Sequence, residues 1–243
     1  MLTEASIASA VVRLALAEGA EVLLTAPLCR AHRLTSRVAP RLGVTAPVLE
    51  LDVTLPEDLA GLESAVREAG WDRVDGVLHA IGYAPDGVLG DGISATPWPG
   101  VAEALQTSTW SLAALVHAVR PLLPRGASVV GLDFDGTRAW PVYGWMGVAK
   151  AGLEAASRYL ARELGPDGIR VNLVAAGPVR TMAARGIPGF ETVEGTWDER
   201  APLGWDTTDA VPVAKAVVAL LSDWFPATTG EIVHVDGGVH ALG

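Results

Sequence analysis

A tyrosine and a lysine, Tyr143 and Lys150, are the pair in this sequence best suited to chemistry. They fall at the start of a segment that reads as a long helix, and steps of roughly 100° per residue bring their side chains to nearly the same face. A phenol beside an ammonium can donate a hydrogen bond to a developing oxyanion, because the cation favours negative charge around the phenol oxygen. From this pair alone, two residues at the edge of an ordinary amphipathic helix are an equally good interpretation.

The composition is that of a globular chain that can bury a large core. It has 243 residues, of which 50% are hydrophobic, and a mean hydropathy of +0.32. A formal charge of -10 disfavours a nucleic-acid or anionic-membrane surface. Cys29 is the only cysteine, which excludes an intramolecular disulfide and fits a reducing compartment. Because no apolar run approaches about 20 residues and no signal peptide opens the chain, we expect a soluble cytoplasmic protein.

Helical and strand patterns alternate along the whole chain. We expect strands at 21–25, 47–51, 74–80, 127–132, 169–175 and 231–235, and helices at 6–18, 30–41, 56–68, about 101–119, 143–165 and 209–222. The run from Thr54 to Glu57 reads as a capping box that starts the third helix. This rhythm predicts right-handed βαβ units and therefore an α/β fold, a doubly wound, Rossmann-like parallel sheet in a single domain over 1–243.

Polar or glycine-rich residues follow four of the predicted strands. The four endings are Asp52-Val53, Ala80-Ile81-Gly82, Leu132-Asp133-Phe134 and Ala176-Gly177-Pro178. Ligands of a doubly wound sheet bind at the carboxyl ends of its strands, so we expect these endings to line one mouth. Each ending taken alone can also be explained as a turn or a helix cap.

Several motifs together resemble the NADH-dependent enoyl-acyl-carrier-protein reductases of bacterial type II fatty-acid synthesis. They are Tyr143 and Lys150 at their spacing, Asp133-Phe134 ahead of them, Asn172-Leu173-Val174-Ala175-Ala176-Gly177-Pro178-Val179-Arg180-Thr181, Ala227-Thr228-Thr229-Gly230 and Val235-Asp236-Gly237-Gly238. The resemblance covers nearly the whole chain from Thr3 onward. The broader short-chain dehydrogenase superfamily has a lysine at the position of Gly147 and a serine near Val130, so the enoyl reductases are the better match.

The resemblance implies three catalytic residues. Tyr143 would donate a hydrogen bond to the thioester carbonyl as it becomes an enolate, Lys150 would hold the nicotinamide-ribose hydroxyls, and Phe134 would pack beside the nicotinamide. The cofactor would supply the hydride, and no metal is implied. The further cofactor contacts that the resemblance implies are Ser6, Ile7, Asp52, Val53, Ile81, Gly82, Gly177, Pro178, Val179 and Thr181.

The resemblance also implies a substrate and an assembly. The segment 182–205 would be a mobile loop that binds a fatty enoyl chain carried by acyl carrier protein. The substrate contacts would be Tyr83, Pro141, Met146, Met182, Ile187 and Phe190. For Trp197 and Trp205, a place in the core is an equally good interpretation. A homotetramer is implied, and the apolar residues of 209–240 suit a covered surface.

Two departures from the family pattern affect the expected cofactor site. The segment 26–30 has no acidic residue to bind the adenosine ribose 2′-hydroxyl, and Arg30 could accommodate a 2′-phosphate. We therefore expect NADH, with NADPH as the alternative. The family's first strand and first glycine have no counterpart before Thr3, so the strands at 21–25 and 74–80 are expected to lack their shared neighbour. A carbonyl reductase and a non-catalytic relative with impaired cofactor binding stay open as other functions.

Overall fold

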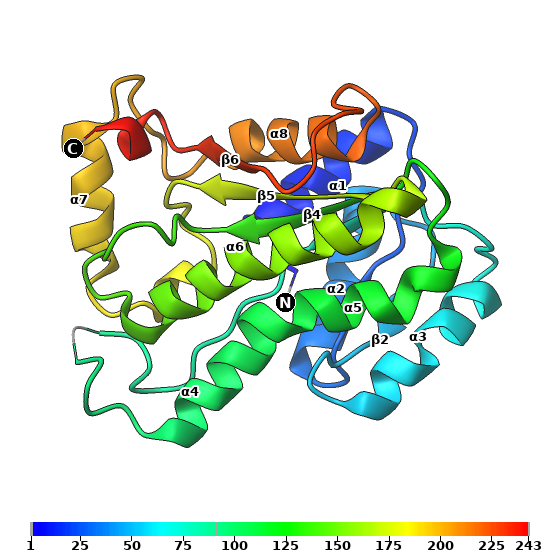
Figure 1. The fold of residues 1–243 in the computed structure, drawn as a ribbon, viewed down its shortest axis with the longest axis horizontal. Coiled ribbons are helices and arrows are strands. Elements are labelled where there is room, and N and C mark those ends of the chain that lie inside the picture. Colours follow the sequence, from blue (N-terminus) through cyan, green and yellow to red (C-terminus); the bar gives the residue numbers. More distant parts are fainter. Residues whose placement is uncertain (1, 91, 243) are drawn as a thin grey trace.

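Helices cover both faces of a set of parallel strands in the computed structural model, which describes residues 2–90 and 92–242 (Figure 1). The strands are β1 (Thr25–Ala26), β2 (Leu49–Glu50), β3 (Gly76–His79), β4 (Ser128–Asp133), β5 (Arg170–Ala176) and β6 (Ile232–Val235). The α-helices are α1 (Ile7–Ala17), α2 (Arg30–Leu42), α3 (Pro56–Glu68), α4 (Trp98–Leu105), α5 (Ser111–Val119), α6 (Gly144–Leu164), α7 (Phe190–Arg200) and α8 (Val211–Leu221). Short helical turns are η1 (Gln106–Trp110), η2 (Arg120–Leu122), η3 (Gly165–Asp167), η4 (Ala184–Gly186) and η5 (Val239–Ala241). The predicted α/β fold with a parallel sheet is confirmed.

The strands form two separate sheets. Strands β3, β4, β5 and β6 pair in that order, all parallel, whereas β1 pairs in parallel with β2. Within the described residues, strands β1 and β3 therefore belong to different sheets, as was expected for them. Strand β1 is also shorter than the predicted 21–25, because its described ladder extends only to the backbone of Leu24 and Ala26 opposite Leu49 and Leu51.

The core lies on both sides of the four-stranded sheet. Along β5, Val171 and Leu173 face the side covered by α5 and α6, whereas Val174 and Ala176 face the side covered by α1 and α8. This alternation follows the period of two of a strand. All of β5 is buried, as is usual for a central strand of a parallel sheet covered on both faces.

The predicted capping box of α3 is wrong. The N-cap of α3 is Leu55, and no side chain among the described residues caps this helix. The Thr54 hydroxyl instead donates to Oδ1 of Asp52 at 2.6 Å, because this carboxylate closes a turn directly before the helix. Pro56 at the first helical position still starts α3 where it was predicted.

The predicted helix at 101–119 is interrupted by a turn of π-helix, η1, between α4 and α5. Within η1, Thr109 donates its hydroxyl proton to the carbonyl oxygen of Ala149 on α6 at 2.6 Å. A Cβ on Gly152 would lie 3.1 Å from the Thr109 methyl group. The π turn is therefore where this broken helix packs closely against α6.

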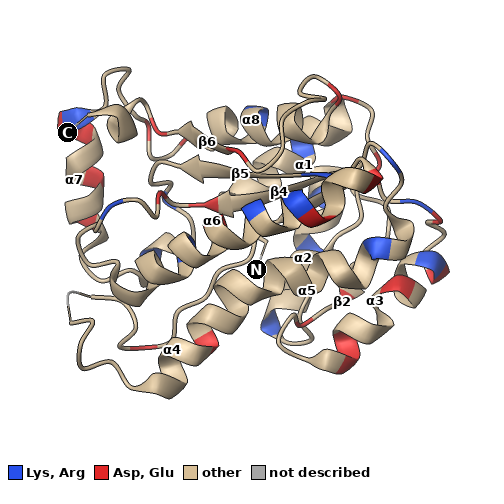
Figure 2. Ribbon diagram, in the orientation of Figure 1, with Lys and Arg blue, Asp and Glu red and all other residues tan. Residues whose placement is uncertain are grey.

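Charged residues concentrate on the outer helices. Figure 2 shows Asp and Glu interspersed with Lys and Arg on α3 and α7, while the strands at the centre are mostly uncharged. Within residues 2–90 and 92–242, no helix has the length and apolar character needed to span a membrane.

Candidate active site

Tyr143 precedes the long helix instead of lying within it, because it is the N-cap of α6. Val142 before it has φ 56, which is unfavourable for a β-branched residue, and its carbonyl oxygen accepts a hydrogen bond from Gly90 at 2.8 Å. Gly144 after it has φ 49, and a Cβ there would lie 2.8 Å from the carbonyl oxygen of Val88. The loop at 88–90 thus fixes the backbone that carries the phenol.

Aromatic rings surround the Tyr143 side chain. The ring of Phe134, which directly follows β4, lies 4.9 Å from the Tyr143 ring at an interplanar angle of 57°. The ring centroids of Trp140 and Trp197 lie 5.4 and 5.6 Å from that of Phe134 and 4.9 Å from each other. Trp197 is buried and donates its indole proton to the carbonyl oxygen of Asp236, which confirms its place in the core. Phe134 is therefore wedged between the phenol and a tryptophan cluster.

Lys150 is buried at the end of β4. Its ammonium donates to the carbonyl oxygen of Leu132 at 2.9 Å and lies 4.0 Å from Oδ1 of Asp133. Lys150 is 7% exposed and Asp133 is 5% exposed. Neither carboxylate oxygen of Asp133 has a hydrogen-bond donor among the residues that the structure describes. Burial lowers the pKa of Lys150, and the charge of Asp133 opposes that effect.

Asp133 also affects the phenol. Burial raises the pKa of Asp133 to about 7, with smaller contributions from Lys150 and the backbone amide of Phe134, which lower it, and from Glu154 and Asp135, which raise it. Burial raises the pKa of Tyr143 well above its usual value, and the charge of Asp133 raises it further. The Tyr143 phenol is therefore protonated at neutral pH and can donate a hydrogen bond.

His79, at the end of β3, is a buried neutral imidazole. Its Nε2 lies 2.8 Å from Oγ of Ser111, whose hydroxyl donates to the carbonyl oxygen of Thr107 at 2.6 Å. The Ser111 oxygen therefore accepts the proton of Nε2, and this network assigns Nδ1 as the unprotonated nitrogen. Nδ1 has no hydrogen-bond partner in the described residues. Burial, and next the charge of Lys150, lower the pKa of His79 to about 3.

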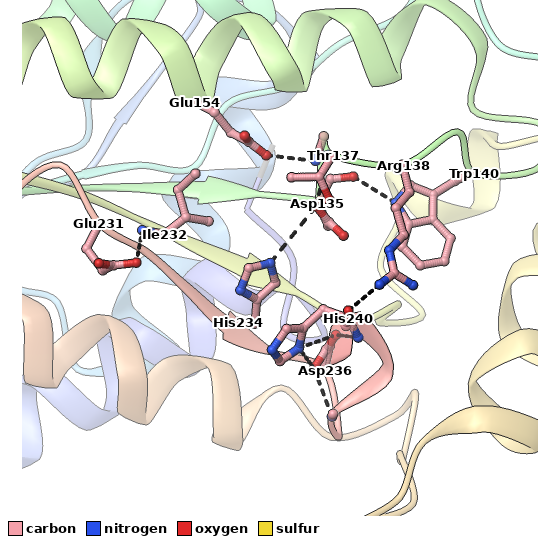
Figure 3. A network of polar contacts seen from close by, with 12 residues as sticks. Asp135, Thr137, Arg138, Trp140, Glu154, Glu231, Ile232, His234, Asp236 and His240 are labelled. Carbon is pink, nitrogen blue, oxygen red and sulfur yellow. Dashed lines mark hydrogen bonds and ion pairs between the residues drawn. The ribbon is translucent and has the colours of Figure 1, made fainter. Parts of the chain in front are cut away.

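A polar network joins the loop after β4 to the last strand and the turn that follows it (Figure 3). Asp135 accepts two hydrogen bonds from Thr137 and lies 4.0 Å from Nε2 of His234 on β6. The rings of His234 and His240 stack with their centroids 4.0 Å apart. His240 donates from Nδ1 to Asp236 at 3.0 Å. These contacts hold the chain after β6 against the loop that carries Phe134.

Three of the four predicted strand endings lie together. Strands β3, β4 and β5 are neighbours in one sheet, with His79 opposite Gly131 and Asp133 opposite Ala175. The fourth ending, Asp52, follows β2 in the other sheet, and its carboxylate binds the backbone and hydroxyl of Thr54.

Comparison with known proteins agrees with this arrangement. The family described as Enoyl-(Acyl carrier protein) reductase matches residues 1–240. This chain belongs to that family. An NADH enoyl-[acyl-carrier-protein] reductase of Mycolicibacterium smegmatis is 44% identical, with 98% of this chain and 93% of the relative covered. The NADH enoyl-[acyl-carrier-protein] reductase of Mycobacterium avium is 43% identical, with 98% of this chain and 92% of the relative covered. An NADPH enoyl-[acyl-carrier-protein] reductase of Staphylococcus aureus is 41% identical, with 81% of this chain and 77% of the relative covered.

The residues of this enoyl reductase family member fit a nicotinamide dinucleotide. An ammonium has three donors, and the bond to Leu132 uses one of them, so Lys150 can also bind hydroxyl groups. Ser6 caps α1 by accepting from Ser9, and the first-turn N–H groups of such a helix attract phosphate. Gly82, after β3, is exposed, so its backbone is open to a ligand.

The other predicted cofactor residues of this family member differ in exposure. Gly177, Pro178 and Val179 are buried, and Ile81 and Thr181 are half-buried. The Gly177 amide donates to the carbonyl oxygen of Val235, and a Cβ on Gly177 would lie 2.7 Å from the Trp197 indole nitrogen. Gly177 thus permits close packing behind the loop that follows β5. Ile7 is half-buried, and Val53 is buried beside β2.

The predicted substrate residues of this family member also differ in their surroundings. Met146 is buried and packs on Val88 and Ala149, so it forms part of the wall beneath Tyr143. Phe190 packs on the Trp197 cluster at the start of α7. Tyr83, Pro141 and Met182 are exposed, and Ile187 is half-buried. The segment 182–205 contains η4 and α7.

Sequence reasoning missed the roles of Asp133 and His79 in this site. Both are polar residues within or at the end of apolar strands, and both point to the face covered by α5 and α6. The available signal was a polar residue on the apolar side of a predicted buried strand. Burying a polar group without a partner is costly, so such a residue indicates a specific role.

Proposed function

We propose that this protein reduces the double bond between the α- and β-carbons of an enoyl thioester carried by acyl carrier protein, with NADH as the cofactor. The observation that supports this most directly is that Lys150 lies 4.0 Å from the buried carboxylate of Asp133, whose charge also raises the pKa of Tyr143, in a chain of the enoyl reductase family. The relatives from Mycolicibacterium smegmatis and Mycobacterium avium are named as NADH enzymes.

Tyr143 would stabilise the charge that develops on the substrate. The thioester oxygen becomes negative only as the enolate forms, so a hydrogen bond to it stabilises the transition state more than the ground state. The raised pKa of Tyr143 keeps this donor protonated. Phe134 would keep the phenol oriented, because its ring packs against the Tyr143 ring on one side and against tryptophans on the other.

The cofactor would be bound along the carboxyl ends of the strands. NADH, when bound, supplies the hydride. Lys150 would donate to the ribose hydroxyls, and the N-terminus of α1 with Ser6 and Ile7 would face the pyrophosphate. We also propose that Asp52 and Val53 contact the adenine, and that Ile81 and Gly82 contact the adenosine side of the cofactor. The residues proposed to lie beside the carboxamide and pyrophosphate are Gly177, Pro178, Val179 and Thr181.

The substrate would be bound by the segment 182–205 together with Tyr83, Pro141 and Met146. An acyl chain offers no hydrogen bonds along its length, so apolar side chains such as Met182, Ile187 and Phe190 suit it. A cytoplasmic location, in which acyl carrier protein would present the substrate, is part of the proposal.

A homotetramer is also proposed. Trp224 is 81% exposed and Phe225 is 44% exposed directly after α8, and large apolar side chains together at a surface are usually covered by a partner. Closed point-group symmetry would cover the same patch on every copy. Static light scattering at micromolar concentration is expected to give four times the chain mass, and a monomer would contradict this part.

One assay tests the reaction against its alternatives. NADH oxidation is followed by absorbance with crotonyl or dodecenoyl thioester, and in parallel with a plain ketone, each also with NADPH. We expect oxidation of NADH with the enoyl thioesters alone. Oxidation with the ketone alone would favour a carbonyl reductase, and no oxidation with any substrate would favour a non-catalytic relative.

A further inference from the structure

Asp133 is a buried carboxylate whose role the motifs do not explain. Both of its oxygens are buried and have no hydrogen-bond donor in the part of the chain that the structure describes. Buried polar groups are nearly always hydrogen-bonded, so a carboxylate left this way needs an explanation. The one ion pair described for it is with Lys150, at 4.0 Å.

The backbone holds Asp133 and Lys150 at one place. Asp133 lies opposite Ala175 of β5 in the parallel ladder, and the small methyl group leaves room for the carboxylate on the face covered by α6. Lys150 reaches this point from the second turn of α6 and donates to the carbonyl oxygen of Leu132. The ammonium therefore faces a peptide oxygen and a carboxylate from consecutive residues.

The other titratable groups around Asp133 do not replace it. Glu154, one turn after Lys150 on α6, accepts from the amide of Gly136 at 2.8 Å. Asp135 accepts from Thr137, beside His234. His79 is neutral at physiological pH, since its pKa is lowered to about 3. Above its pKa of about 7, Asp133 is thus the anion placed to act on the buried ammonium.

We propose that Asp133 is a positioning residue that keeps Lys150 protonated and holds its ammonium at the end of β4. The same charge raises the pKa of Tyr143, whose phenol is protonated at neutral pH with or without it. The directions of the pKa shifts agree, because Asp133 raises the pKa of Lys150 and of Tyr143. The consequence for catalysis rests on the proposed function, whereas the charge state of Lys150 does not.

The chain offers an unusually direct test, because its lysines are Lys150 and Lys215. With lysine labelled by ¹³C at Cε, each lysine gives one signal, and exposed Lys215 serves as an internal reference. In the cofactor-free protein, we expect Asp133→Asn to lower the midpoint of the Lys150 titration by at least about one pH unit, a tenfold change in proton affinity. Asp135→Asn is the matched control, and it should leave the midpoint of the Lys150 titration within a few tenths of a pH unit of the wild-type value.

If Asp133→Asn does not fold, Asp133→Ser is used, since it also removes the charge. An unchanged Lys150 midpoint in a folded neutral variant overturns the proposal. In the pH profile of kcat/KM, the alkaline limb is expected to lie at lower pH in Asp133→Asn than in the wild type, as the Lys150 midpoint does. If the wild-type protein shows no enoyl thioester reduction while the Lys150 midpoint moves, the proposed function fails and the role of Asp133 in the charge of Lys150 stands.

Discussion

The phenol ring of Tyr143 packs against Phe134 with the ring centroids 4.9 Å apart. This contact involves the faces and edges of the rings and does not use the Tyr143 hydroxyl. The position of the ring and the chemistry of its oxygen can therefore be separated by mutation.

Tyr143→Phe is expected to keep the ring packing and lose the hydrogen bond to the enolate. Loss of one such donor typically costs about 3 kcal/mol, so turnover should fall about 10²-fold or more. NADH binding, measured by fluorescence titration, should stay close to that of the wild type. Undiminished turnover would remove Tyr143 from this role.

Lys150→Ala is expected to weaken NADH binding as well as turnover, because the ammonium would bind the ribose hydroxyls of the reacting nicotinamide. Lys215→Ala removes an exposed lysine and is the matched control. Both variants are titrated with NADH. A Lys150→Ala protein that binds NADH as tightly as the control would exclude a ribose contact.

Stability should decrease in acid because of His79. Its pKa is lowered in the folded state to about 3, so between pH 6.5 and 3 the unfolded chain binds a proton that the folded chain does not. The free energy of unfolding should then fall by about 1.4 kcal/mol per pH unit from this residue, or about 2 kcal/mol at pH 5. The free energy of unfolding of the wild type minus that of His79→Gln should therefore decrease by about 2 kcal/mol between pH 7.5 and 5. Urea unfolding of the two proteins at each pH measures this difference.

Two glycine substitutions should have opposite effects on the melting temperature. A Cβ on Gly136 would lie 2.6 Å from the backbone nitrogen of Ala151 on α6, so Gly136→Ala must displace the loop after β4 and should cost about 1 to 3 kcal/mol. A Cβ on Gly61 within α3 would meet no described atom within 4 Å, so Gly61→Ala should stabilise the fold by about 0.5 to 1 kcal/mol. A neutral Gly136→Ala would show that the loop moves freely.

Adding a strand of the form Val-Leu-Val-x-Gly before Thr3 is expected to raise the melting temperature and the NADH affinity. Such a strand could pair with β1 and β3, which now belong to separate sheets, and its glycine turn would lead into α1. Each ladder hydrogen bond formed should contribute about 0.5 to 1.5 kcal/mol. A scrambled extension of equal length is the control. Equal melting temperature and affinity for the two would show that β1 and β3 need no shared neighbour.

The sequence predicts much of this fold because strands and helices are encoded locally. The apolar run at 169–175 matches β5, and the predicted helix at 209–222 contains α8. The parallel arrangement followed from the alternation of elements. The family also followed, because Tyr143, Lys150 and the glycine motifs lie at characteristic spacings.

Other features depend on contacts between distant segments and were not predicted. Tyr143 precedes α6 because positive φ angles at Val142 and Gly144 are stabilised by the loop at 88–90. Strand β1 is limited to Thr25–Ala26 and lies in a different sheet from β3. The buried pair of Asp133 and Lys150 depends on the ladder register of β4 and on how α6 crosses it, which no local pattern encodes.

The π turn η1 marks the place where this helix can absorb a change in chain length. A π turn holds one residue more than an α-helical turn, so a chain shorter by one residue between 106 and 110 can continue as α-helix without rotating α5 relative to α4. A one-residue deletion from the regular turns of α4 would instead rotate Ser111 by about 100° relative to the start of that helix, away from His79. Among homologous chains, one-residue gaps in this helix should therefore fall between 106 and 110, and the residue equivalent to Ser111 should stay beside the residue equivalent to His79.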